Sequence, residues 1–388
     1  MRSISSQMAL TRVFDMHTFI HACAGSGKTQ RIVERCASSP PVRKRCLILT
    51  LTDSGQAELE TRLSKCCTPE RQPKVMGWYS FLIQHVIRPY LPLCFPGQKI
   101  NGFDFNASRE YREKMFVRKT CPERYFTPAG CLLRDRVEEL AAKVIEAASG
   151  RVENRLGKTY AELIIDEVQD ISRAGLDVIK ALLMQVHLPT FMVGDVRQSL
   201  IDSSTSSTKN KKADRLQLLK WFRQLKSAYP DLLTIQEMNH TYRSHKEIAF
   251  FSDAIMNPDH GFTATTAEDK EPTGHDGVFL VNESDIEEYN ALYRPVHLKY
   301  SRGSSTKPTE NFITFGKSKG LEWDRVAIHM TKPMIKLLKD GHTFLPEKSA
   351  CGFYVAVTRA RNSLALIIPS GKKLQPHERF KVTFWKPR

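Results

Sequence analysis

Residues 22–29 read Ala22-Cys23-Ala24-Gly25-Ser26-Gly27-Lys28-Thr29. The apolar run Thr18–Ala22 precedes this stretch, and Lys28–Cys36 follows it with the spacing of a helix. Glycines let a backbone curl so that its N–H groups face an anion, and the start of the next helix adds a positive dipole end. A strand, a glycine-containing turn and a helix in this order predict a phosphate-binding loop lined by residues 24–27. The alternative is a flexible Gly/Ser turn.

This loop predicts how a nucleoside triphosphate would be bound. The ammonium group of Lys28 would reach the β- and γ-phosphates, and the hydroxyl of Thr29 would ligate Mg²⁺. An apolar strand, Leu163–Ile165, ends in Asp166 and Glu167. Asp166 can hold the Mg²⁺ shell, while Glu167 can polarise the attacking water. Such an acidic pair is common by chance, but together with the loop it predicts hydrolysis of ATP or a closely related purine triphosphate.

Apolar runs alternate with helical segments along the chain, which predicts an α/β fold with parallel, doubly wound sheets. The expected strands are Thr18–Ala22, Arg45–Thr52, Glu162–Ile165, Thr190–Val193, Gly277–Val281, Asn311–Thr314, Arg325–His329 and Leu364–Ile368. Residues 106–150 have helical periodicity without strand signals, so we expect a small helical insertion at about residues 90–155. The expected domains are residues 1–230, which contain the phosphate loop, and residues 231–388.

The composition points to a nucleic-acid partner and away from a membrane. The chain has 388 residues and a formal net charge of +16. A surplus of this size favours polyanions through counterion release, although a solubilising surface is the alternative. No apolar run approaches the ~20 residues that span a bilayer, and the first residues lack the pattern of a signal peptide. We therefore expect a cytoplasmic protein without membrane contact.

The residues that follow the acidic pair are more specific. Asp166-Glu167-Val168-Gln169-Asp170 resembles the DExQD form of motif II in the UvrD/Rep group of superfamily 1 helicases. Segments similar to motifs Ia, III, IV, V and VI of that group follow its order: Leu49–Leu63, Phe191–Gln198, Asn239–Ser244, Gly316–Trp323 and Val355–Arg361. The resemblance covers nearly the whole chain. It implies two RecA-like P-loop NTPase domains, called 1A and 2A in the group, with a 1B-like insertion in the first.

The resemblance also implies catalytic roles for residues outside the loop. Gln198 and Arg243 would sense the γ-phosphate, and Arg359 would act as an arginine finger from the second domain. Planar, permanently charged donors suit the charge that spreads over a transferring phosphoryl group. The catalytic residues would therefore be Glu167, Gln198, Arg243 and Arg359.

Four more residues would contact the nucleotide if the resemblance holds. Tyr242 would stack on the purine, and Gly320 and Glu322 of the motif V segment would contact the nucleotide, Glu322 at the ribose. Gln7 lies upstream of Lys28 at a spacing similar to that of the group's adenine-reading Q motif.

The chain departs from the group in its nucleic-acid contacts. About seventy residues separate Arg243 from Lys319, which is too few for the large inserted 2B-type domain of the members that unwind long duplexes. Leu51 replaces the aromatic residue of motif Ia. Trp78 and Tyr79 could supply a stacking surface instead, and core packing accounts for them equally well. Processive unwinding is therefore in doubt.

Three functions follow from these observations. The first is a DNA-stimulated, Mg²⁺-dependent ATPase that translocates on DNA or opens it with 3′ to 5′ polarity, acting on single-stranded or tailed duplex DNA. The second is a nucleotide-sensing switch that regulates a partner nuclease. The third is a nucleic-acid-binding scaffold without activity, which the retained site residues disfavour.

Among compact relatives, the chain resembles the helicase-like B subunit of Gabija antiphage systems. The resemblance lies in Val86–Tyr90 and in the small size of the insertions. That resemblance implies an OLD-family nuclease with a Toprim domain as partner and a role in antiviral defence.

Overall fold

The computed structural model describes residues 17–38, 44–105, 117–184, 188–200, 216–301, 303, 311–370 and 374–387. Two six-stranded sheets organise them. The strands of the first sheet are, in spatial order, β3 (Lys74–Gly77), β2 (Arg45–Thr50), β6 (Tyr160–Ile165), β7 (Thr190–Gly194), β1 (His17–Ala22) and β8 (Leu233–Met238). All neighbours in it are parallel. Its central strands are buried apolar runs, as expected for a parallel sheet covered on both faces.

The second sheet is also parallel throughout. Its strands are β13 (Ile313–Thr314), β12 (Val296–Lys299), β14 (Trp323–His329), β15 (Ala360–Ile368), β11 (Gly277–Asn282) and β16 (Thr383–Phe384). The predicted α/β class is confirmed, and two sheets of this kind are consistent with two RecA-like domains. The described residues between Arg243 and Lys319 belong to this second unit, and no separate inserted domain is found among them.

Helices connect the strands of each sheet. In the first unit they are α1 (Lys28–Ala37), α2 (Asp53–Cys66), α3 (Trp78–Phe81), α4 (Arg88–Tyr90), α6 (Val137–Ala148), α7 (Arg151–Thr159), α8 (Arg173–Leu183) and α9 (Leu218–Ala228). In the second unit they are α10 (Lys246–Ala254), α11 (Ile286–Tyr293), α12 (Lys332–Asp340) and α13 (Glu347–Val357). A π-helical segment, Leu82–Ile87, joins α3 to α4. None of the helices described here is long and apolar enough to cross a bilayer.

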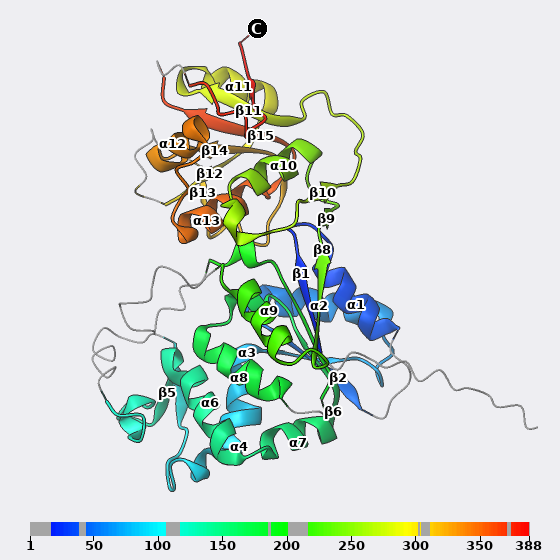
Figure 1. The fold of residues 1–388 in the computed structure, drawn as a ribbon, viewed down its shortest axis with the longest axis vertical. Coiled ribbons are helices and arrows are strands. Elements are labelled where there is room, and N and C mark those ends of the chain that lie inside the picture. The colour runs from blue at the N-terminus through cyan, green and yellow to red at the C-terminus, as the bar shows by residue number, and fades with distance from the viewer. Residues whose placement is uncertain are drawn as a thin grey trace, which may run out of the picture.

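The two units form separate lobes (Figure 1). We call β1 to β8 with their helices the first lobe, and everything from β9 (His240–Thr241) onward the second lobe. The short strands β9 and β10 (Thr266–Ala267) pair with each other and lie where the lobes meet. Helices α4, α6 and α7 lie at the far end of the first lobe, away from the second. This arrangement leaves one junction between the lobes for a shared site.

The first sheet extends further along the chain than the expected domain boundary. Leu233–Met238, which we placed in the second domain by dividing the chain at residues 230 and 231, forms β8 and pairs with β1 over its whole length. The sequence did not reveal this strand as part of the first sheet, because parallel neighbours so far apart in the chain leave no local signal. The first sheet therefore ends after Met238.

The insertion is less helical than predicted. Residues 106–150 were expected to be helical. Residues 106–116 lie outside the described residues, and in the rest of this range α6 begins only at Val137. Cys131–Leu133 instead forms β5, which pairs with β4 (Gly102–Asp104). Buried Leu132 and Leu133 satisfy the hydrophobic pattern of either structure, so periodicity alone did not distinguish them.

Trp78 belongs to the core rather than to a stacking surface. Its side chain is 1% exposed, and its indole Nε1 donates a hydrogen bond to Glu138 Oε1 at 2.7 Å. Tyr79 is half-buried and packs against the same core. Burial thus decides in favour of core packing for Trp78, and this side chain is not available to stack on a base.

Candidate active site

The phosphate loop has the backbone that its glycines predict. Gly25 and Gly27 have φ values of 72° and 82°, in the left-handed region that side chains rarely adopt. Helix α1 begins at Lys28 with no side-chain cap and no acidic residue in its first turn. Thr52 and Ser172, by contrast, cap α2 and α8 with their hydroxyls. The first N–H groups of α1 are therefore available to donate hydrogen bonds to an anion.

Asp166 lies at the end of β6, on the same edge of the sheet as the loop that follows β1. It is buried, and its Oδ1 accepts the backbone N–H of Glu167 at 2.9 Å. Among the described residues, no hydrogen bond is made to Oδ2. Burial and the neighbouring Glu167 carboxylate raise the pKa of Asp166 to about 7. A buried carboxylate with an open oxygen is the kind of oxygen ligand that Mg²⁺ takes.

Glu167 is held in a strained position by both lobes. Its φ of 53° lies in the left-handed region, which is rare for a residue with a side chain and recurs at functional sites. Its Oε2 accepts a hydrogen bond from Gln169 and lies 3.5 Å from the Lys319 ammonium of the second lobe. Burial opposes its ionisation, but Lys319 and Lys28 lower the pKa of Glu167.

Lys319 connects the lobes directly. Besides Glu167 it forms an ion pair with Asp170, and its Nζ donates to the backbone oxygen of Gln198 at 3.4 Å. Both carboxylates belong to the DExQD segment, whereas Lys319 lies in the segment that resembles motif V. These contacts bring two predicted motifs together at one place.

Gln198 and Arg359 meet across the junction. Gln198 ends the 3₁₀ turn Val196–Gln198 after β7, and Arg359 follows α13. The Nη2 of Arg359 donates to Gln198 Oε1 at 3.3 Å. The other acceptors of the guanidinium are Val355 O at 2.9 Å, Leu321 O at 3.1 Å and Thr358 Oγ1 at 3.2 Å.

Arg359 is a buried cation that forms no ion pair among the described residues. Its side chain is 1% exposed, yet the acceptors named above are all neutral. Within the described part of the chain, no ion pair includes it. Burial and the nearby Arg243 lower the pKa of Arg359 to about 9. Because a buried charge is normally compensated, this arrangement calls for an anion at the junction between the lobes.

Arg243 lies beside Arg359 but is already paired. Its guanidinium forms an ion pair with Glu322, and its Nη1 donates to Thr358 O at 3.4 Å. The second oxygen of Glu322 accepts a hydrogen bond from Arg361. Both oxygens of Glu322 thus face arginines in this structure, where the sequence led us to expect a ribose contact.

Tyr242 lies at the edge of the phosphate loop. Its backbone N–H donates to Gly25 O at 3.0 Å, and its side chain is 61% exposed. An exposed aromatic ring at this place can stack on a base. Gly320 has a φ of 86° and lies between Lys319 and Leu321. Gln7, the predicted adenine-reading residue, lies outside the described residues.

Comparison with known proteins identifies the family. A profile of the AAA domain family matches residues 7–203, half of the chain. The chain belongs to the AAA domain family. The matched AAA domain runs from upstream of β1 to beyond Gln198, so it includes the phosphate loop and both acidic residues, and it is a helicase-type ATPase domain that binds ATP. No curated protein matches the sequence.

Two solved structures resemble the AAA domain protein along most of its length. The arterivirus nonstructural protein 10 (helicase) covers 91% of this chain and 60% of its own, at 10% identity and a TM-score of 0.47. The same protein with DNA covers 92% and 62%, at 11% identity and a TM-score of 0.44. The chain spans about three fifths of the length of these structures.

Contacts reveal further residues of the site, to which the sequence assigned no role. Asp170 lies in the segment that resembles motif II and Lys319 in the segment that resembles motif V. Asp195 is wholly buried, and Tyr354 reaches it from α13 at 3.1 Å. Tyr354 immediately precedes the segment that resembles motif VI and lies one helical turn before Thr358, which is the signal that could have pointed to it.

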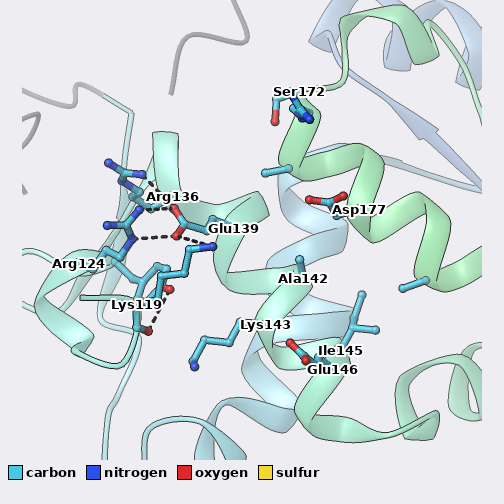
Figure 2. A pocket seen from close by; sticks show the side chains of 14 residues that line it. Lys119, Arg124, Arg136, Glu139, Ala142, Lys143, Ile145, Glu146, Ser172 and Asp177 are labelled. Carbon is cyan, nitrogen blue, oxygen red and sulfur yellow. Dashed lines mark hydrogen bonds and ion pairs between the residues drawn. The ribbon is translucent and has the colours of Figure 1, made fainter. Parts of the chain in front are cut away.

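A cavity of about 750 Å³ lies in the first lobe, away from the junction. Figure 2 shows Lys119, Arg124 and Arg136 gathered around Glu139, with Asp177 on the facing helix α8. Arg124 and Arg136 are paired with that carboxylate at 2.8 and 2.9 Å. Basic and acidic side chains share its lining, and α8 beside it is capped by Ser172. The phosphate loop at the interlobe junction therefore remains the candidate site for a triphosphate.

The close contact at Gly25 gives a testable prediction for the AAA domain. A Cβ at this position would lie 2.4 Å from Arg243 Cβ and 2.6 Å from Thr241 Oγ1. Gly25→Ala must therefore displace the second lobe from the loop, and misplacement by about 1 Å can slow catalysis ~100-fold. We expect a loss of this order in ATP turnover. Gly97→Ala is the control, because Gly97 has a φ of 80° but nothing within 4 Å. Equal turnover in the two variants would contradict the prediction.

Proposed function

We propose that this chain is a Mg²⁺-dependent ATPase of superfamily 1 helicase type that is stimulated by DNA. It translocates on single-stranded or tailed duplex DNA, or opens the duplex locally, with 3′ to 5′ polarity. The single observation that carries the proposal is the buried guanidinium of Arg359, which meets Gln198 of the other lobe and forms no ion pair among the described residues. The γ-phosphate of ATP supplies its anionic partner.

In this proposal the first lobe binds the triphosphate. The loop of residues 24–27 and the uncapped start of α1 surround the phosphates. The N–H groups that follow Ala24 bind the phosphate oxygens, because that of Ala24 donates to Tyr354, and Lys28 approaches the β- and γ-phosphates. Thr29 and Asp166 would hold Mg²⁺, for which the open Oδ2 of Asp166 is a suitable ligand. Bound Mg²⁺ would neutralise charge that develops on the phosphate oxygens.

The residues around the γ-phosphate then carry out hydrolysis. Glu167 orients and deprotonates the attacking water, and it must first exchange its contact with Lys319 for that water. Gln198 and Arg359 bind the transferring phosphoryl group, and Arg243 joins them after leaving Glu322. Tyr242 stacks on the base, Gly320 lets the backbone approach the nucleotide, and Gln7 reads the adenine.

Nucleotide binding at the junction between the lobes drives the movement on DNA. Lys319, Arg359 and Tyr242 all come from the second lobe and contact the first. A bound triphosphate strengthens these contacts and hydrolysis weakens them, so the lobes close and open with each cycle. The net charge of +16 supports a polyanionic track for this movement.

A nucleotide-dependent switch is the second candidate function. The burial of Trp78 removes a stacking surface that sustained unwinding would use, and the described residues contain no separate inserted domain. In this version the same closure regulates a partner nuclease of the OLD family. The similarity to the B subunit of Gabija antiphage systems supports this partner and a role in antiviral defence.

A strand-displacement assay separates the two candidates. The chain is mixed with ATP, Mg²⁺ and a duplex that carries either a 3′ or a 5′ single-stranded tail. Displacement from the 3′-tailed duplex only is the result we expect of the translocase. ATP turnover without displacement from either duplex would reject the translocase, and the nucleotide-dependent switch would remain as the candidate function. Absence of ATP turnover, with and without DNA, would overturn both.

A further inference from the structure

Asp195 is the centre of a buried hydrogen-bond network at the lobe junction. It follows β7, and its carboxylate is 0% exposed. Oδ1 accepts from the backbone N–H of Arg197 at 3.1 Å and from its Nε at 3.3 Å. Oδ2 accepts from Gln198 Nε2 at 2.8 Å and from the hydroxyl of Tyr354 at 3.1 Å. Four donors on one buried carboxylate hold each of them in a fixed direction.

The charge of this carboxylate is maintained by its surroundings. Burial opposes ionisation of Asp195, but Arg197 and Lys28 outweigh it and lower its pKa. Arg197 in turn donates to Asp253 of the second lobe at 2.7 Å. Hydrogen bonds to a buried, ionised acceptor are about twice as strong as neutral ones. Asp195 can therefore orient its donors firmly.

Tyr354 links this network to the phosphate loop. Its hydroxyl donates to Asp195, and it accepts the backbone N–H of Ala24 at 3.3 Å. A phenol can donate and accept at the same time, which phenylalanine cannot. The ring lies against Arg197, whose Cζ is 4.8 Å from the ring centroid, and the side chain is 1% exposed. The second lobe thus contacts the backbone of the loop that binds the phosphates.

The network determines which way the amide of Gln198 points. Because Nε2 of Gln198 donates to Asp195, its Oε1 is turned toward Arg359 and accepts from Nη2 at 3.3 Å. A continuous series of hydrogen bonds therefore joins Ala24, Tyr354, Asp195, Gln198 and Arg359. It starts at the phosphate loop and ends at the guanidinium of Arg359, which has no ion pair in the described part of the chain.

We propose that Tyr354 is a positioning residue for ATP hydrolysis. Its hydroxyl couples the phosphate loop to Asp195 and so fixes the orientation of Gln198 and Arg359 at the γ-phosphate. This inference rests on the proposed ATPase function, because it concerns the same site. Tyr354 itself does not touch the reacting atoms. Loss of its hydroxyl therefore acts on the rate of hydrolysis and leaves ATP binding in place.

The test is Tyr354→Phe in the full chain, with Tyr300→Phe as the matched control. Tyr300 also places a hydroxyl against α13, 3.2 Å from Ser349 Oγ, but makes no contact with the network. We expect kcat to fall about ten- to hundred-fold in Tyr354→Phe, the effect of one hydrogen bond to a charged acceptor. The Kd for a non-hydrolysable ATP analogue stays within about twofold, and Tyr300→Phe retains the wild-type kcat.

A double-mutant cycle distinguishes positioning from a structural effect. If Tyr354 acts through Gln198, the pair Tyr354→Phe and Gln198→Ala lowers kcat no further than the more severe single change. If the reductions in kcat caused by the two single changes multiply in the double variant, the hydroxyl acts independently of Gln198 and the inference is overturned. So would a wild-type kcat in Tyr354→Phe, or a loss of analogue binding equal to the loss of kcat.

The outcome also separates this inference from the function on which it rests. If the wild-type chain hydrolyses ATP and Tyr354→Phe hydrolyses it equally fast, the positioning role fails while the ATPase remains. If the wild-type chain shows no turnover with or without DNA, the proposed function itself fails.

Discussion

Arg359→Ala is expected to slow ATP hydrolysis by a factor of ~10³–10⁵, the range associated with arginine fingers. The guanidinium is buried at the lobe junction and contacts Gln198, and no ion pair among the described residues includes it. Its charge is therefore available to the phosphoryl group in the transition state. ATP binding should stay largely intact, because the phosphate loop belongs to the other lobe. Single-turnover hydrolysis and equilibrium binding of an ATP analogue measure the two effects separately.

The control for this change is Arg379→Ala. Arg379 is also a second-lobe arginine whose guanidinium donates to backbone oxygens, those of Gly341 at 3.3 Å and Met256 at 2.6 Å. Its removal should leave turnover unchanged. Arg359→Lys keeps a positive charge but not the planar fork, and should recover only part of the rate. Full activity of Arg359→Ala would show that this residue has a structural role alone.

Lys28→Ala is expected to abolish measurable hydrolysis, with a loss of at least ~100-fold, as for other groups that stabilise transition-state charge. Lys28 is the first residue of α1, where the uncapped helix start already favours an anion. None of the ion pairs among the described residues includes it. Removing the ammonium leaves the phosphate oxygens without their charge partner in the first lobe. Turnover at saturating ATP and Mg²⁺ is the measurement.

Lys44→Ala is the matched control in the same lobe. Its ammonium donates to the backbone oxygen of Gly157 at 2.6 Å, at the opposite side of the sheet from the phosphate loop's strand end. Its loss should leave turnover near the wild-type value. If Lys28→Ala keeps turning over ATP at a comparable rate, the triphosphate does not bind where we assign it.

Local patterns were sufficient for most strands of the two sheets. The runs at Thr18–Ala22, Glu162–Ile165 and Thr190–Val193 became β1, β6 and β7, because a strand buried on both faces is mostly apolar. β12 was missed because Val-His-Leu-Lys is short and half polar, although His297 and Lys299 are buried. The insertion was misjudged for a related reason: a short apolar segment such as Cys131–Leu133 fits a strand or a helix equally well.

The site was predictable where its chemistry lies within one motif. The phosphate loop combines a strand, glycines and a helix within a few residues. Its backbone geometry agrees with the predicted glycine-containing turn before a helix. The contacts between motifs were not predictable in the same way. Nothing in the sequence indicates that Glu322 would face Arg243 and Arg361, or that Lys319 would reach Asp170. The functional roles of these residues await the measurements described above.

Local sequence patterns were enough to predict the α/β class, the phosphate loop and the two acidic residues that follow a buried strand. Each of these depends on side chains or glycines that are neighbours in the chain, so local physical chemistry decides them. Three other features became known from long-range contacts: Leu233–Met238 completes the first sheet, Trp78 lies in the core, and Tyr354 joins Ala24 to Asp195. These three features depend on which distant segments become neighbours when the chain folds. Such long-range packing produces no periodic pattern in the sequence.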